Sequence, residues 1–137
     1  MTVEIPGPVL TRESILEYAQ RYDPQPFHVD EEAAKQSPYG GLIASGWHTV
    51  SLAMRMICDA YLLDAASLGS PGVNQVRWLK PVRPGDSLRL RMTVLEAKPS
   101  TSKPDRGTVL HRWDVLNQNG ETVMTMEGYG MFRRRGA

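Results

Sequence analysis

The chain is poor in cysteine, in net charge and in long apolar runs. Its 137 residues include one cysteine, Cys58, so no intramolecular disulfide can form and we expect a reducing, cytoplasmic setting. Sixteen basic and fifteen acidic residues leave a net charge of +1, which gives no electrostatic argument for a nucleic-acid or membrane partner. No stretch approaches the roughly 18 apolar residues of a membrane span, and no leader pattern is seen. We therefore expect one soluble domain over residues 1–137.

Signatures of metal and phosphate binding are also missing from the sequence. The three histidines, His28, His48 and His111, lie far apart and are not joined by clustered cysteines or by ligand spacing. No glycine-rich phosphate loop is present. We predict that the protein uses no metal and no cofactor.

Three segments have the apolar spacing and the capping residues of helices. The first begins after Thr11 and ends before Pro24, where a helix cannot continue. A short second helix is expected after Asp30, which is a good N-cap residue. The longest helix is predicted from Gly46 to about Leu63, and because it is apolar over most of its circumference we expect it to be buried.

The second half of the chain favours antiparallel strands. Polar and apolar residues alternate in four segments bounded by turn residues, and Asn119-Gly120 is a hairpin signal. The four predicted strands are 73–81, 87–97, 107–116 and 121–133. A buried helix followed by consecutive antiparallel strands indicates an α+β fold, a curved sheet wrapped around one helix. Such a sheet has free edges, and pairing two copies edge to edge would cover them, so we expect a homodimer.

The segment 22–30, YDPQPFHVD, joins the first two predicted helices and contains the best catalytic candidates. Asp23 and His28 are five residues apart in a loop that Pro24 and Pro26 restrict to few conformations. A carboxylate and an imidazole held in this way can bind and deprotonate one water molecule.

Segments 22–30, 41–49 (GLIASGWHT) and 76–86 (VRWLKPVRPGD) together resemble the MaoC-like acyl dehydratases, the (R)-specific enoyl-CoA hydratase family. The resemblance implies a hot-dog fold, a homodimer with active sites near the subunit interface, possibly assembled further, and an acyl-CoA thioester substrate. Many hydratases of this family have Asn at the position of Gln25 and His at that of Ser45. These two departures leave the acyl specificity open.

By the same resemblance, the reaction is the reversible addition of water to a trans-2-enoyl thioester. Asp23 and His28 would share the water. Which of them transfers the proton stays open, because such a coupled pair titrates as a unit. The N–H of Gly46, at the start of the long helix, would stabilise negative charge on the thioester oxygen. Close packing is the other explanation for this glycine. Substrate contacts are expected from Gln25, Tyr39, Ser45, Trp47 and His48.

Two other functions stay open. The hot-dog fold also hosts thioester hydrolysis, so a thioesterase is one alternative. A non-catalytic subunit that binds acyl thioesters is the second, although a pure binder has no need for a water-activating pair. The sequence does not identify the acyl group or the pathway. It also does not show whether the acyl carrier is CoA or an acyl-carrier protein.

Overall fold

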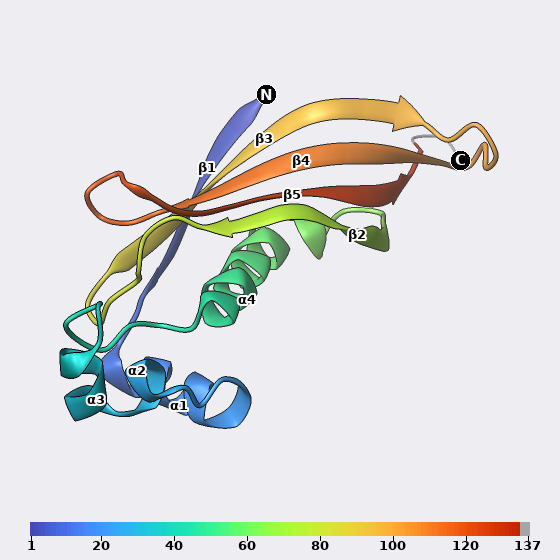
Figure 1. The fold of residues 1–137 in the computed structure, drawn as a ribbon. Coiled ribbons are helices and arrows are strands. Elements are labelled where there is room, and N and C mark those ends of the chain that lie inside the picture. Colours follow the sequence, from blue (N-terminus) through green and yellow to red (C-terminus); the bar gives the residue numbers. More distant parts are fainter. Residues whose placement is uncertain (135–137) are drawn as a thin grey trace.

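A computed structural model describes residues 1–134, and the last three residues of the predicted 1–137 domain lie outside this range. A five-stranded antiparallel sheet arches over one long helix, α4 (Gly46–Ile57) (Figure 1). The strand order is β1-β3-β4-β5-β2. The strands are β1 (Thr2–Val9), β2 (Ser67–Trp78), β3 (Ser87–Pro99), β4 (Arg106–Leu116) and β5 (Thr122–Arg133). The predicted sheet around one helix is thereby confirmed.

Three short helices gather below the sheet, near the start of α4 (Figure 1). They are α1 (Arg12–Tyr22), α2 (Pro26–Val29) and α3 (Glu31–Gln36). Both predicted caps are confirmed, because the Thr11 side chain accepts a hydrogen bond from Ser14 N and the Asp30 carboxylate accepts from two backbone N–H groups. The segment 22–30 is more ordered than the expected loop, since Pro26 opens the single turn of α2.

The N-terminal strand β1 was not predicted. Pro6 and Pro8 within it argue against a strand, because proline cannot donate to a ladder. β1 nevertheless lies at an edge of the sheet and pairs with β3, placing Ile5 opposite Leu90. An edge strand can leave one row of N–H groups unpaired, which explains why the prolines are tolerated.

The long helix differs from its prediction in two ways. α4 ends at Ile57 and continues as one π-helical turn, η1 (Cys58–Leu62), rather than as regular helix to Leu63. It is also not buried all round, since Trp47 and Met54 are 57% and 43% exposed in the single chain. β2 begins at Ser67, six residues before the expected start at residue 73, because its Ser-, Gly- and Pro-rich first half reads as a loop.

The core lies between the sheet and α4. On β3 the predicted alternation is confirmed, with Leu88, Leu90 and Met92 buried. They pack with Ala53 and Ile57 of α4 and with apolar residues of the neighbouring strands. Burying each large apolar side chain stabilises the fold by roughly 1.5–3 kcal/mol. No helix in residues 1–134 is both long and apolar enough to cross a membrane.

Candidate active site

The carboxylate of Asp23 stands at the point where α1 ends. Its backbone N–H donates to Ala19 O at 2.8 Å, which completes the last turn of α1, and Pro24 then prevents the helix from continuing. The Asp23 carbonyl accepts from Gln25 N at 2.8 Å, which turns the chain sharply. The helix end therefore places this side chain beside α2.

His28, on α2, faces Asp23. Its Nδ1 lies 2.8 Å from Ile43 O, and because a carbonyl oxygen accepts only, this nitrogen carries the proton. The other ring nitrogen, Nε2, lies 3.4 Å from Asp23 Oδ2, and the side chain is buried. In neutral His28, Nε2 has a lone pair, so both groups can accept hydrogen bonds from one molecule between them. The structure thus brings together the two residues expected to share a water.

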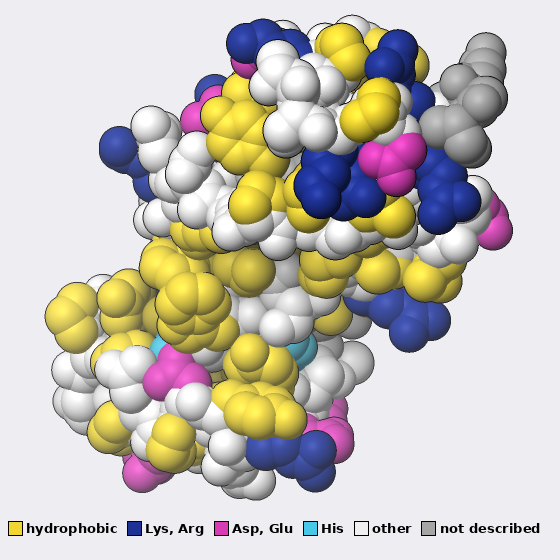
Figure 2. All heavy atoms as spheres, turned by 90° about the vertical axis from the view of Figure 1, so that its right-hand side faces the viewer, with side chains coloured by type: hydrophobic (Ala, Val, Ile, Leu, Met, Phe, Trp, Pro, Cys, Tyr) yellow, Lys and Arg dark blue, Asp and Glu magenta, His cyan; other side chains and the backbone are white. Residues whose placement is uncertain are grey.

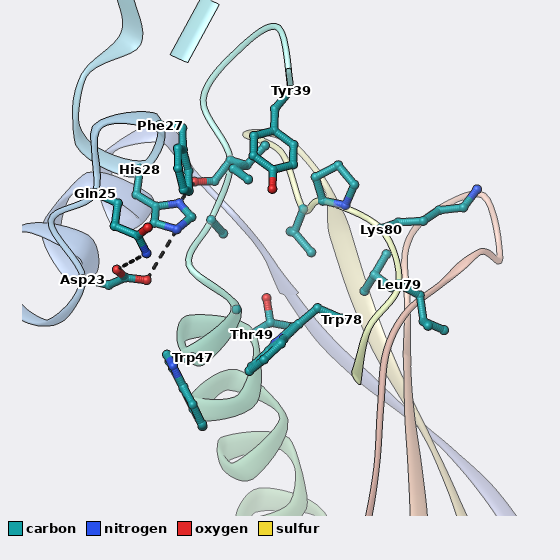
Figure 3. Close-up of a pocket in the computed structure, with 16 residues that line it drawn as sticks. Asp23, Gln25, Phe27, His28, Tyr39, Trp47, Thr49, Trp78, Leu79 and Lys80 are labelled. Atoms are coloured by element: carbon teal, nitrogen blue, oxygen red, sulfur yellow. Dashed lines mark hydrogen bonds and ion pairs between the residues drawn. The ribbon is translucent and has the colours of Figure 1, made fainter. Parts of the chain in front are cut away.

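Two neutral donors hold the Asp23 carboxylate. Gln25 Nε2 donates to Oδ1 at 2.7 Å and the Ser45 hydroxyl donates to Oδ2 at 2.7 Å. Burial acts to raise the pKa of Asp23, but the hydrogen bonds from Ser45 and Gln25, with the nearby His28, outweigh it and bring this pKa below its ordinary value. The carboxylate is therefore ionised at neutral pH. Figure 3 shows dashed lines that join Asp23 to Gln25 and to His28.

The start of α4 lies beside this pair. Ser45 is its N-cap and accepts from Trp47 N at 3.3 Å, which leaves Gly46 as the first helical residue. Within residues 1–134, the Gly46 N–H has no hydrogen-bond acceptor. A Cβ added to Gly46 would lie 2.5 Å from the indole of Trp78. Gly46 therefore combines a free backbone donor with close packing, the two roles that the sequence left open.

Asp23, His28 and Gly46 border one cavity of about 370 Å³. The aromatic rings of Phe27 and Tyr39 lie on its upper side, and those of Trp47 and Trp78 on its lower side (Figure 3). The two aromatic pairs have ring centroids 5.3 and 5.2 Å apart. The remaining walls are Gln25, Ile43, Ala44, Thr49, Leu79, Lys80, Pro81, Val82 and Val123. Aromatic and apolar walls dominate the middle of the cavity, with Asp23, Gln25 and His28 grouped on one side and Lys80 on the other (Figure 3).

Most of the predicted site residues meet in this cavity. Of the expected substrate contacts, Gln25, Tyr39 and Trp47 line it. Ser45 and His48 do not. Ser45 is fully buried behind Asp23, and His48 stacks on Tyr18 with ring centroids 4.5 Å apart.

Sequence reasoning missed Thr49, which lines the cavity. It stands three residues after Gly46, and that spacing, which puts both on one helical face, was the available signal. Within residues 1–134, no three potential metal-ligating side chains form a cluster.

Comparison with known proteins identifies the family. Residues 2–113 match the family model of the MaoC like domain. The chain belongs to the MaoC-like dehydratase family. Its relatives include a mesaconyl-CoA hydratase of Cereibacter sphaeroides, 42% identical over 81 residues, which are 59% of this chain and 22% of that protein. The protein YdeM of Bacillus subtilis is 29% identical over 119 residues, covering 87% of this chain and 82% of YdeM.

Solved structures of MaoC-like proteins share the fold. A MaoC-like dehydratase from Rhodospirillum rubrum is 39% identical and superposes with a TM-score of 0.91, covering 100% of this chain and 93% of that one. The R-hydratase PhaJ1 from Pseudomonas aeruginosa, 24% identical, superposes with a TM-score of 0.79 over 98% of this chain and 81% of its own. The predicted hot-dog fold is confirmed.

Proposed function

We propose that this MaoC-like protein is a hydro-lyase that adds water reversibly across the C2–C3 double bond of a trans-2-enoyl thioester. The observation that carries the proposal is the convergence of Asp23 Oδ2 and His28 Nε2, 3.4 Å apart, in a cavity that Gly46 also lines. By family resemblance the product is the (R)-3-hydroxyacyl thioester, and the reverse reaction is a dehydration.

The geometry supports separate roles for the two residues. Water bound between them donates one hydrogen bond to Asp23 and one to His28. Asp23 is already satisfied by two donors and has a lowered pKa, so it is a weak base and orients the water. His28 Nε2 has an unshared lone pair, because the ring proton lies on Nδ1 toward Ile43 O. We therefore assign the proton transfer to His28, which becomes an imidazolium beside the Asp23 carboxylate.

The bonds change in two steps. As His28 takes a proton, the water oxygen bonds to C3, the C2–C3 π bond shifts toward the thioester, and negative charge develops on the carbonyl oxygen. The N–H of Gly46, at the positive end of the α4 dipole, stabilises that charge. His28 then returns its proton to C2, so the enzyme regains its starting state. Tyr39 and Trp47 form the walls against which the acyl group lies, and Gln25 acts through Asp23.

Relatives support the reaction class. The mesaconyl-CoA hydratase and the 3-hydroxyacyl-thioester dehydratase Z of Mycobacterium tuberculosis, 34% identical over 74 residues, are named for hydration or dehydration of acyl thioesters. The aligned regions span 22% and 49% of those proteins, so the activity of the whole relative comes to this chain as a proposal.

The test is an incubation with crotonyl-CoA and with longer, branched and dicarboxylic enoyl-CoAs. Loss of the conjugated enoyl-thioester absorbance without release of free thiol is the expected result. Thiol release would instead make the protein a thioesterase. Tight binding of thioesters without turnover of any of them would favour the non-catalytic binding subunit.

We also propose a homodimer. β2 is an edge strand whose residues are mostly exposed, including Val73 at 54% and Trp78 at 45%. Hydrophobic side chains gather at the waist between the sheet and the lower helices (Figure 2). Pairing of two β2 edges would cover this surface. Sedimentation equilibrium is expected to give twice the chain mass of 15.3 kDa, and a monomer mass at micromolar concentration would refute the dimer.

A further inference from the structure

Thr49, in the first turn of α4, has a hydroxyl group that the mechanism above does not use. The residue is 2% exposed and lines the cavity of the candidate site. A threonine or serine on a helix often donates to a carbonyl of the preceding turn, and Ser51 does so, to Trp47 O at 2.8 Å. The Thr49 hydroxyl makes no such bond, and no other group in residues 1–134 pairs with it. Its proton is therefore available.

The hydroxyl of Thr49 opens into the cavity. Thr49 Oγ1 is not one of the unpartnered polar atoms of residues 1–134 that are closed off from solvent, so this oxygen is reachable although the rest of the residue is covered. Figure 3 shows the Thr49 side chain rising from α4 toward the open middle of the cavity. Nearly all buried polar groups in proteins are paired. A nearly buried hydroxyl that is reachable only from the cavity therefore points to a ligand as its partner.

The position of Thr49 on α4 brings this hydroxyl close to Gly46. The two residues are three apart, so they are neighbours on one face of the helix, and both line the same cavity. Side chains on a helix lean toward its N-terminus and cover the preceding turn, which here begins at Gly46. An oxygen atom that accepts from the Gly46 N–H therefore lies within reach of the Thr49 hydroxyl.

The polar groups on the same side of the cavity do not supply this donor. The Asp23 carboxylate and the Nε2 of His28 are acceptors, and the Gln25 amide already donates to Asp23 at 2.7 Å. The indole N–H of Trp78 also lies beside the start of α4, but that residue is 45% exposed, so water can pair with it. Thr49 is the donor whose pairing requires a ligand.

We propose that Thr49 is a further catalytic residue, whose hydroxyl donates a second hydrogen bond to the thioester oxygen beside the N–H of Gly46. The inference rests on the proposed function, since it takes this oxygen to lie at Gly46. Negative charge that develops on the oxygen during the addition of water is then shared between two donors. The hydroxyl keeps its proton throughout, so no bond is made or broken at Thr49.

The contact can be measured without turnover. Butyryl-CoA has the thioester oxygen, and its thioether analogue S-butyl-CoA lacks it. Titration calorimetry would give the dissociation constants of both ligands for the wild type, Thr49→Val and Thr49→Ser. Thr49→Val keeps the shape of the side chain but loses the hydroxyl, so it should weaken the binding of butyryl-CoA about three- to tenfold and leave that of S-butyl-CoA unchanged. Thr49→Ser keeps the hydroxyl and should bind both ligands as the wild type does.

Ser51→Ala is the matched control, because it removes an exposed hydroxyl from the same helix outside the cavity wall. It should leave both affinities unchanged. An equal loss of affinity for the two ligands in Thr49→Val would show that Thr49 acts through packing and would overturn the proposal, as would an unchanged affinity for butyryl-CoA. A loss specific to butyryl-CoA in Trp78→Phe but not in Thr49→Val would assign the donor to the indole and would also overturn it.

Turnover separates this proposal from the proposed function. With crotonyl-CoA as substrate, Thr49→Val should lower kcat about 100-fold, as the loss of one donor to an oxyanion does, with a smaller change in KM. Thr49→Ser should recover most of the lost kcat. A wild-type kcat in Thr49→Val would keep the hydro-lyase and overturn the role of Thr49. A wild type that hydrates no enoyl-CoA, with a loss of affinity for butyryl-CoA alone in Thr49→Val, would refute the hydro-lyase and keep the contact between Thr49 and the thioester oxygen.

Discussion

The hydroxyl of Ser45 donates to Asp23 Oδ2 at 2.7 Å while its oxygen accepts from Trp47 N at 3.3 Å. One buried side chain therefore ties the carboxylate proposed to orient the water to the start of the helix proposed to face the thioester oxygen. The sequence suggested that Ser45 touches the substrate, but the structure places it behind Asp23. We infer that it is a positioning residue.

Replacing Ser45 with Ala should lower kcat about 10- to 100-fold, because a hydrogen bond to a charged group is worth about 1.5–3 kcal/mol. KM should change little, since Ser45 lies outside the cavity wall. The measurement is steady-state hydration of an enoyl-CoA. Ser14→Ala is the matched control: it breaks the capping box at the start of α1, at the opposite end of that helix from Asp23. Equal losses in the two variants would show that Ser45 acts only through helix stability.

The titration of Asp23 gives an independent readout of the same contacts. Gln25→Met removes the donor at Asp23 Oδ1, and the pKa of Asp23 should rise because that hydrogen bond lowers it. Ser45→Ala removes the donor at Oδ2 and should raise the pKa of Asp23 in the same way. The Asp23 carboxyl resonance, followed by NMR through the acid pH range, should show the higher pKa in both variants. A pKa of Asp23 at the wild-type value in both would contradict the role given to the two donors.

The two roles of Gly46 can be separated by a double-mutant cycle. Gly46→Ala places a methyl group against the Trp78 indole and should lower both stability and kcat/KM. Trp78→Ala removes that clash. If the thioester oxygen approaches the Gly46 backbone closely, the methyl group should hinder it even without the indole, so the Gly46→Ala/Trp78→Ala double variant should recover its melting temperature but stay at least tenfold less active than Trp78→Ala. Because alanine keeps the backbone N–H, equal activity of these two variants would show that the substrate needs no open space at the Cα of residue 46.

Buried histidines should make stability depend on pH. Burial lowers the pKa of His48 below its ordinary 6.5, so the unfolded chain binds this proton more readily. Stability is therefore complete above about pH 6.5 and falls as pH decreases from there toward the folded pKa, by up to about 1.4 kcal/mol per pH unit. Urea unfolding at pH 7.5 and 5.5 should show a smaller difference for His48→Phe, which keeps a ring on Tyr18. If the stability of that variant changed with pH as steeply as that of the wild type, His48 would be excluded as a source of the pH dependence.

Local signals predicted the helix caps and the antiparallel strands. A helix cap or a hairpin turn depends only on residues that are close in sequence, so it can be predicted from the sequence. Examples are the caps Thr11 and Asp30 and the turn at Asn119-Gly120. The proximity of Asp23 and His28 was also expected, because Pro24 and Pro26 confine the segment that carries them.

Features that depend on distant parts of the chain were missed. β1 was overlooked because its prolines are tolerated only at a sheet edge, and edge position is a property of the whole sheet. Spacing could not show that Ser45 turns toward Asp23, 22 residues earlier, while His48 turns toward Tyr18. The exposed flank of α4 was missed for the same reason, since apolar periodicity does not distinguish a face covered by the chain's own sheet from one left open.

The central claim, that Asp23 and His28 activate water for addition to an enoyl thioester, is tested most directly by their near-isosteric variants. Hydration of a trans-2-enoyl-CoA that the wild type turns over would be followed with purified Asp23→Asn and His28→Gln, with circular dichroism and sedimentation to establish that each is folded as the wild type is. The account predicts that kcat falls by at least 100-fold in each variant, with thioester binding retained. A wild-type kcat in either folded variant would contradict it.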